Sequence, residues 1–218
     1  MRARRLAIVG VLAAVVSCAP DAADEAPAER VEPATTLVYE CDDGYQFVAR
    51  IQGETAWVFL PETTAALPHV PAGSGARYSE GGITYWSSGE EALLEVGGSE
   101  HRACANNRRR AVWEHAKLNG ADFRAVGNEP GWVLEIYPRR MVLVTDYGDH
   151  RYEFETPEPV ERPDERRTTF EAADRGLRVL VVLEGRECRD TMSGEAFETT
   201  VAVKLDDTTY RGCGRPLH

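Results

Sequence analysis

Short runs of alternating apolar and polar residues cover most of the chain after residue 36. In residues 45–52, Tyr45, Phe47, Ala49 and Ile51 alternate with neighbours that are polar except for one valine. A period of two is that of a half-buried β-strand. The same pattern predicts strands at residues 56–60, 77–79, 83–87, 91–96, 100–104, 131–136, 141–146, 152–156, 168–172, 177–184, 197–205 and 208–213. The predicted fold class is therefore all-β, built from short antiparallel strands.

One segment interrupts the strand pattern near the middle of the chain. Residues 106–110 are polar and basic, and residues 111–118 predict a short helix that Asn119 and Gly120 would end. We therefore expect two small antiparallel β domains, residues 36–105 and 122–218, joined by a linker with a short helix at 106–121. Within the second domain, residues 157–163 carry prolines at both ends and predict a long exposed loop.

The chain begins with a segment typical of export. Three arginines in residues 1–5 precede eleven apolar residues, 6–16, which is too few to span a bilayer that needs ~20 helical residues. Ending on Cys18 after small residues, this signal peptide (residues 1–17) resembles a bacterial lipobox, which implies cleavage before Cys18 and its lipidation. An ordinary signal peptide with an incidental cysteine is the alternative. Ala19 in place of aspartate resembles lipoproteins sorted to the outer membrane, facing the periplasm.

Residues 18–35 are rich in alanine, proline and acidic residues, and predict a flexible tether. The formal net charge of the chain is −11, and removal of residues 1–17 leaves 22 basic against 36 acidic residues, a charge of −14. Such a chain is a poor binder of nucleic acid, because that affinity depends on neutralising phosphates. It would instead attract a cationic partner.

The cysteines predict disulfides rather than a metal site. Without Cys18, four remain: Cys41, Cys104, Cys188 and Cys213. An even number in an exported chain indicates a disulfide framework, with three possible connectivities. We favour Cys41 with Cys104 and Cys188 with Cys213, because each pair brackets one domain and would stabilise it by roughly 3–5 kcal/mol. Zinc is the rival, but the chain has no Cys-x-x-Cys and its five histidines show no ligand spacing. We expect no metal and no cofactor.

Residues 72–89 combine two glycine-bounded polar loops. Gly73 and Gly75 flank Ser74 and would allow a tight turn that lifts its hydroxyl into solvent. Tyr78 and the pair Tyr85–Trp86 would anchor the returning strands in a core. Loops displayed on a β scaffold are where binding residues concentrate.

This stretch resembles the membrane-bound, MliC-like inhibitors of c-type lysozyme. The resemblance covers about residues 37–104 and implies a barrel of about eight strands. It places the first-loop serine of the family on Ser74 and the second-loop tryptophan and glycine on Trp86 and Gly89. The family lysine before that glycine is replaced here by Ser88; in the family, this lysine and the serine engage the two catalytic carboxylates of lysozyme. The implied lysozyme-binding residues are Ser74, Gly75, Arg77, Tyr78, Trp86 and Ser88.

The second domain offers motifs but no recognised chemistry. Residues 123–132, 188–194 and 212–215 resemble a domain of unassigned function that recurs in bacterial lipoproteins. Asn128, Glu129, Asp190 and Ser193 invite a catalytic interpretation, but turn and capping roles explain such residues as well. The chain has no Gly-x-Ser-x-Gly elbow, no glycine-rich phosphate loop and no metal-binding helix. The sequence therefore does not predict an enzyme.

The leading hypothesis is a lipid-anchored envelope protein that binds, and can inhibit, c-type lysozyme by inserting loops 73–78 and 86–89 into its cleft, with Ser88 weakening the contact. Arg77 is the nearest substitute for the missing cation, although it is expected on a strand. The rival is a non-inhibitory binding lipoprotein of the cell envelope, motivated by Ser88, by the neighbouring Glu90 and Glu91, and by the second domain. A hydrolase acting through the second domain is a third, weaker class. The oligomeric state stays open.

Overall fold

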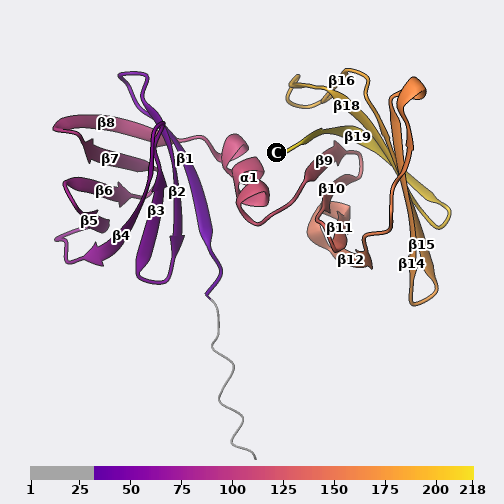
Figure 1. Cartoon of the computed structure of the whole chain (residues 1–218), viewed down its shortest axis with the longest axis horizontal. Coiled ribbons are helices and arrows are strands. Elements are labelled where there is room, and N and C mark those ends of the chain that lie inside the picture. Colours follow the sequence, from indigo (N-terminus) through magenta and orange to yellow (C-terminus); the bar gives the residue numbers. More distant parts are fainter. Residues whose placement is uncertain (1–31) are drawn as a thin grey trace, which may run out of the picture. The chain divides into compact units, whose positions relative to one another are not determined.

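The computed structural model describes residues 32–218. The predicted signal peptide, the lipidation site Cys18 and most of the predicted tether lie outside the described residues. The described part contains two antiparallel sheets, one on each side of a single α-helix in the chain order (Figure 1). The all-β prediction is confirmed. Among residues 32–218, no helix is both long and apolar enough to cross a membrane.

The first sheet is a closed barrel of eight strands in sequence order. Its strands are β1 (Thr35–Glu40), β2 (Gln46–Gln52), β3 (Thr55–Phe59), β4 (Thr64–Val70), β5 (Ala76–Glu80), β6 (Ile83–Ser88), β7 (Glu91–Val96) and β8 (Ser99–Asn106). The barrel closes where β1 pairs with β8. The eight strands implied by the resemblance are confirmed. Strand β4 was not predicted, because it contains Pro68 and only one fully buried residue.

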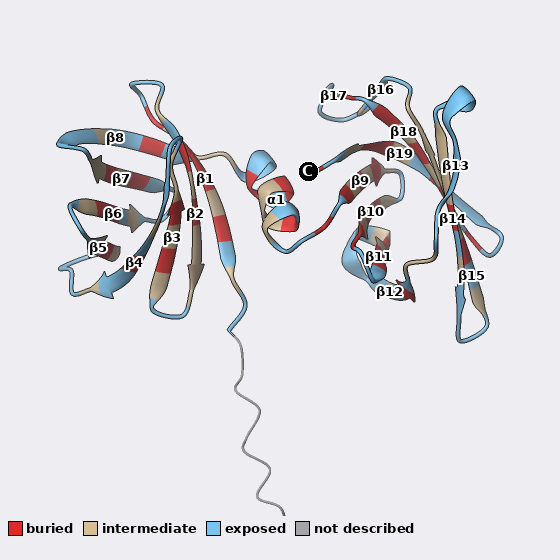
Figure 2. Cartoon of the chain, in the orientation of Figure 1, coloured by how far each residue is buried: buried red, intermediate tan, exposed pale blue. Residues whose placement is uncertain are grey.

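An aromatic cluster fills the barrel. Tyr39, Phe47, Tyr78 and Tyr85 are all buried, with ring centroids 5.0 Å apart for Tyr39 and Phe47 and 5.8 Å apart for Tyr78 and Tyr85. The hydroxyls of Tyr39 and Tyr85 lie 3.1 Å apart, so each buried polar end has a partner. Buried and exposed positions alternate along the strands, as the period of two predicted (Figure 2).

Two glycine pairs make the tight hairpins of the barrel. Gly81 and Gly82 join β5 to β6, and Gly97 and Gly98 join β7 to β8; all four have positive φ, between 59° and 81°. Two successive residues with positive φ define the turn whose twist matches that of antiparallel strands, and glycine adopts it without steric cost.

Helix α1 (Arg108–Leu118) follows the barrel and confirms the predicted helix, with a start three residues earlier. Asn107 caps it, because its side-chain oxygen accepts a hydrogen bond from the Arg110 backbone N–H at 3.1 Å. Trp113 is buried in a second-domain cluster, where the Arg215 guanidinium lies 4.5 Å from the ring centroid. Trp113 and Ala116 of the helix thus pack with residues of the second sheet, whereas Arg110 bonds to Glu40 of the barrel.

The second sheet has nine strands in the order β12-β11-β10-β9-β19-β18-β15-β14-β13, with a separate two-stranded ribbon, β16-β17. The elements are β9 (Phe123–Asn128), β10 (Gly131–Ile136), β11 (Arg140–Thr145), η1 (Asp146–Gly148), β12 (His150–Glu155), β13 (Val160–Arg162), η2 (Pro163–Glu165), β14 (Arg167–Asp174), β15 (Leu177–Glu184), β16 (Cys188–Arg189), β17 (Ala196–Phe197), β18 (Thr199–Leu205) and β19 (Thr208–Pro216). These strands fall within residues 122–218, the range expected for the second β domain.

One face of the half-barrel carries the main core. Val179 and Val181 of β15 pack with Val201 and Val203 of β18, and the cross-strand register pairs Val181 with Val203. The opposite face near β9, β10, β11 and β19 packs in part against α1.

One prediction for the second domain was wrong in detail, and one of its strands was not predicted. Residues 157–163 are not a continuous loop: Val160–Arg162 pairs with β14 as strand β13, and Pro163 begins the short helix η2. All three residues of β13 are exposed, which is why the sequence shows no strand pattern there. Strand β9 was also not predicted, because its inward positions include the small residues Ala125 and Gly127.

Both favoured disulfides are present, Cys41–Cys104 in the barrel and Cys188–Cys213 in the second domain. The first ties the end of β1 to β8, where only two residue pairs close the barrel. The second ties β16 to β19.

Candidate protein-binding site

The predicted site residues lie in the β4–β5 loop and in two consecutive barrel strands. Ser74 and Gly75 belong to the loop between β4 and β5, whereas Arg77 and Tyr78 are in β5. Trp86 and Ser88 are in β6, before the two-residue turn Gly89–Glu90. The predicted loops 73–78 and 86–89 therefore contain strand residues as well, because only residues 71–75 and 89–90 are loop. The strands β5 and β6 fix the side chains on either side of these loops.

A hydrogen bond joins the two loops. The indole Nε1 of Trp86 donates to the backbone oxygen of Ser74 at 2.8 Å, and the Ser74 side chain is exposed. Gly75 lies between them with φ +65°, and a Cβ there would overlap the backbone carbonyl of Ser87. The conformation that displays Ser74 thus depends on a glycine at position 75 and on the indole of Trp86.

Replacement of Gly75 by alanine should destabilise the barrel by about 1–2 kcal/mol, because an L-residue in the left-handed region costs that much even before the overlap with Ser87 is relieved. The measurement is the free energy of unfolding by urea. Gly73→Ala is the matched control, since a Cβ at Gly73 would meet nothing within 4 Å and φ there is not positive. Equal stability of the two variants would contradict this account of the loop.

The three aromatic residues of the site have different roles. The rings of Tyr78 and Tyr85 lie in the barrel core, as predicted. Trp86 does not: it is 38% exposed on the outer side of the barrel, which corrects the expectation that it anchors β6 in the core. Successive residues of a strand point to opposite faces, so Trp86 points outward because the adjacent Tyr85 points into the barrel. Trp86 is therefore available to a partner, and Tyr78 contributes by holding β5 in place.

Two arginines flank Trp86 across the outer face. The register pairs Trp86 with Arg77 on one side and with Leu93 on the other. Next to Leu93, a β-bulge in β8 interrupts the pairing of β7 with β8, and Ala103 in the bulge has φ +48°. Arg102, also in the bulge, lies on the far side of Leu93 from Trp86. The Arg102 side chain is 72% exposed and forms an ion pair with Glu100. Sequence reasoning missed Arg102, because only the strand register brings it to the site.

Trp86, Ser88 and Arg102 line a common pocket of about 230 Å3, with Glu91 and Leu93 among the other lining residues. Arg77 is half-buried, and its Nε is enclosed without a hydrogen-bond partner among the described residues. The site therefore presents a serine hydroxyl, an indole edge and an exposed guanidinium on one surface. It contains no nucleophile paired with a base.

The turn beside Ser88 is tied to the start of α1. Glu90 accepts hydrogen bonds from Arg108 Nη2 at 2.7 Å and Nε at 3.0 Å, and from the Asn106 side chain at 3.0 Å. The hydrogen bonds from Arg108, then that from Asn106, lower the pKa of Glu90 from 4.5 to about 2. Of the two acidic neighbours of Ser88, only Glu91 is left without such a partner, directly across from Ser88 in the register.

Glu90 should titrate with a pKa of about 2 rather than 4.5. Because the folded pKa is depressed, its ion pair with Arg108 contributes stability above pH 4.5 and loses it as the pH falls through about 2. Carbon-detected NMR of the Glu90 carboxyl group measures this directly. In the Arg108→Gln variant the midpoint should rise towards 4.5; a wild-type midpoint already near 4.5 would mean that the pair does not form in solution.

The polar residues singled out in the second domain hold a turn. Asp190 accepts hydrogen bonds from the backbone N–H of Met192 at 3.1 Å and of Ser193 at 2.6 Å, and from the Asn128 side chain at 2.7 Å. The Ser193 hydroxyl accepts from the Glu195 backbone N–H at 3.2 Å. Glu129 is exposed. These contacts are those of turn and capping residues and do not pair a base with a nucleophile. No metal-binding group of three or more His, Cys, Asp or Glu side chains occurs within residues 32–218.

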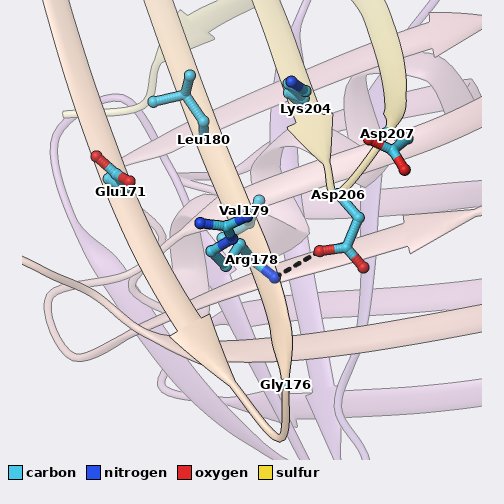
Figure 3. A pocket seen from close by; sticks show the side chains of 8 residues that line it. All are labelled: Glu171, Gly176, Arg178, Val179, Leu180, Lys204, Asp206 and Asp207. Carbon is cyan, nitrogen blue, oxygen red and sulfur yellow. Dashed lines mark hydrogen bonds between the residues drawn. The ribbon is translucent and has the colours of Figure 1, made fainter.

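A larger pocket, of about 510 Å3, lies at the ends of β14, β15 and β18 (Figure 3). Its charged lining residues are Arg178, Lys204, Glu171, Asp206 and Asp207. The Asp206 carboxylate accepts a hydrogen bond from the Arg178 backbone N–H at 2.9 Å and so stabilises the β18–β19 turn. Because the pocket is open and its lining carries both positive and negative charges, it does not indicate a particular class of ligand.

The fold and the site define a class: a closed eight-stranded barrel with one disulfide, in which a hydrogen bond joins the β4–β5 loop to Trp86 of β6. Residues 39–103 match the family model of the membrane-bound lysozyme-inhibitor of c-type lysozyme, MliC. Residues 39–103 are thus similar to this family, as the resemblance implied, and the family is one of inhibitors rather than enzymes. No curated protein and no solved structure matches the chain.

Proposed function

We propose that the first domain binds c-type lysozyme and inhibits it by occluding its active-site cleft. The observation that carries the proposal is the match of residues 39–103 to the MliC family. The hydrogen bond between Trp86 and Ser74 supports it, because it combines the two loops into one surface. Interfaces of high affinity place an aromatic or arginine anchor at the centre, and Trp86 between Arg77 and Arg102 fits that description.

Inhibition of this kind needs no chemistry on the inhibitor. The exposed hydroxyl of Ser74 would donate a hydrogen bond to one catalytic carboxylate of lysozyme, as the family serine does. Binding in the cleft would exclude the glycan substrate. Because the carboxylates are then desolvated, a cation near them is worth far more than one on an exposed surface.

Ser88 cannot supply that cation, and we propose that Arg102 does. The Arg102 guanidinium shares a pocket with Trp86 and Ser88 and is exposed. Arg77, the substitute expected from the sequence, is half-buried in β5. An arginine also suits carboxylates better than lysine does, because its planar fork makes two parallel hydrogen bonds. The ion pair of Arg102 with Glu100 would have to open, which makes the expected inhibition weaker than that of a loop lysine.

Titration of c-type lysozyme with residues 18–218 carrying Cys18→Ser tests both statements. Arg102→Gln should raise the inhibition constant about tenfold, and Ser74→Ala should raise it as well, since hydrogen bonds to charged groups contribute about 1.5–3 kcal/mol. Arg175→Gln is the control with the same charge change, because Arg175 is 91% exposed on the second domain. No inhibition by the folded protein would contradict the proposed function; inhibition that is insensitive to Arg102→Gln would remove Arg102 alone.

We also propose that the protein is lipid-anchored at Cys18 in the outer membrane, facing the periplasm. The support is the lipobox-like end of the signal peptide and the family's description as membrane-bound. Labelled palmitate should enter the wild type and not Cys18→Ser, and membrane fractionation should place the wild type with outer-membrane markers. Labelling of Cys18→Ser would contradict the anchor.

A non-inhibitory binding lipoprotein is the second candidate, and Glu91 favours it. This carboxylate lies across from Ser88 without a cationic partner, and it would repel the carboxylates of lysozyme. Retention on isolated peptidoglycan without inhibition would support that alternative.

A further inference from the structure

Three segments of the second domain that lie far apart in the sequence meet at one place. The Asn128 amide donates to Asp190 at 2.7 Å, which joins β9 to the β16–β17 ribbon. The Trp132 indole donates to the backbone oxygen of Arg211 at 3.3 Å, which joins β10 to β19. Gly212 lets Trp132 approach, since a Cβ there would lie 2.8 Å from the ring. The motifs at residues 123–132, 188–194 and 212–215 therefore build one local structure.

A cleft of about 420 Å3 opens above this junction. Its floor is a row of three valines, because the register pairs Val133 with Val126 on one side and with Val144 on the other. We call it the valine cleft. Its volume falls in the range of about 300–1,000 Å3 that is typical of ligand sites. Val126 and Val144 also pack against the cluster that contains Trp113, so the floor is the uncovered continuation of a core.

Two exposed apolar side chains border the valine cleft. Tyr147 is 81% exposed and Met192 is 79% exposed, and residues 32–218 contain only three other large exposed hydrophobic side chains. Tyr147 is held in place by a left-handed backbone, φ 59°, and by a hydrogen bond from its hydroxyl to the Asn128 backbone oxygen at 3.1 Å. A strained, exposed aromatic residue at a cleft is typical of a binding site.

The chemistry of the cleft favours an apolar group over a sugar. The Asn128 amide, the Tyr147 hydroxyl and the Asp190 carboxylate already have partners within the protein. Recognition of a glycan depends on polar groups that are free to bond its hydroxyls. The valine floor and the flexible Met192 instead suit an aliphatic or aromatic side chain.

Three acidic residues are chain neighbours of residues that line the valine cleft. Glu129 follows Asn128, Asp146 precedes Tyr147 and Asp149 follows Gly148 in the chain. None of these three carboxylates forms an ion pair with another described residue, and the whole chain has a net charge of −11. Arg151, which pairs with Val144 in the register, is a base beside the floor. An occupant with positive charge around an apolar group is complementary to this surface.

We propose that the valine cleft binds a cationic peptide segment of a partner protein, with one large apolar side chain seated between Tyr147 and Met192. This site is in the second domain and is independent of the inhibition proposed for the barrel. It gives the converging motifs a common role: the first contributes Val126, Asn128 and Trp132 to the lining and the second contributes Met192. Gly212 of the third motif allows the close approach of Trp132.

Fluorescence anisotropy with labelled pentapeptides tests the proposal on residues 18–218 carrying Cys18→Ser. The probe has a central phenylalanine flanked on each side by two lysines; the comparison peptides replace the phenylalanine by serine or the lysines by glutamates. Only the first should bind saturably at low salt, and its affinity should fall as sodium chloride is added. Equal binding of the serine peptide, or binding of the glutamate peptide, would overturn the proposal.

Met192→Ser should weaken binding of the phenylalanine peptide about tenfold, because it removes apolar area from one wall. Glu129→Gln should weaken binding most at low salt. Val160→Ser and Glu158→Gln are the matched controls, since Val160 is 60% exposed and both lie outside the cleft. Three results would each overturn the proposal. They are an unchanged affinity in Met192→Ser, binding of a neutral chitooligosaccharide in place of the peptide, and dimerisation of the protein that Met192→Ser abolishes. Lysozyme inhibition should be unaffected by Met192→Ser, so failure here and failure of the proposed function are distinguishable.

Discussion

Ser88→Lys should strengthen inhibition of c-type lysozyme about 30-fold, which corresponds to about 2 kcal/mol. Removing one partner of a charge pair that is desolvated in an interface costs roughly 2–5 kcal/mol. Restoring the family lysine would place a cation two residues after Trp86 on the displayed surface. We expect the lower end of that range, because Glu91 lies across from position 88 and would compete for the new ammonium group. The measurement is the inhibition constant at two salt concentrations.

Ser99→Lys is the matched control, because it adds the same charge at the start of β8, next to the hairpin turn at the other end of β7. It should change inhibition little. The double variant Ser88→Lys with Glu91→Gln should inhibit more strongly than Ser88→Lys alone. No gain from the lysine in either background would mean that the β6–β7 turn does not enter the cleft as it does in the family, and the non-inhibitory alternative would gain support.

Loss of the Cys41–Cys104 disulfide should lower the free energy of unfolding of the barrel by about 4 kcal/mol. The two cysteines are 63 residues apart, and a cross-link of that span removes much of the chain entropy of the unfolded state. Both are buried, and the bond reinforces the closure of β1 on β8, which rests on two residue pairs. Denaturant unfolding of the Cys41→Ser, Cys104→Ser double variant measures the effect.

The Cys188→Ser, Cys213→Ser variant is the internal comparison. Its cysteines are 25 residues apart, so its loss should be smaller, about 3.5 kcal/mol, and should affect the second domain. Lysozyme inhibition should therefore be lost at lower temperature in the first variant and be retained in the second. Equal losses of inhibition in both variants would indicate that the barrel does not act on its own.

Much of the fold follows from the sequence alone. Alternation along β2, β3, β6, β15 and β18 identified these strands, because burial on one face leaves a period of two in the residues. The cysteine count with two β regions led to the pairing that the structure contains. The sequence did not reveal strands that are stabilised by pairing with neighbouring strands rather than by their own composition. These are β4 with Pro68, β9 with Gly127, and the fully exposed β13.

The sequence also identified the candidate loop residues, but only the tertiary structure decided whether each side chain lies in the core or on the surface. Tyr85 and Trp86 are equally apolar in sequence, yet one fills the barrel and the other lies outside, since a strand turns adjacent side chains to opposite faces. Arg102 reaches the site through strand register and a bulge, and Val133 meets Val126 and Val144 in the same way. Contacts of this kind join residues from separate strands, and local periodicity carries no information about which strands become neighbours or in which register they pair.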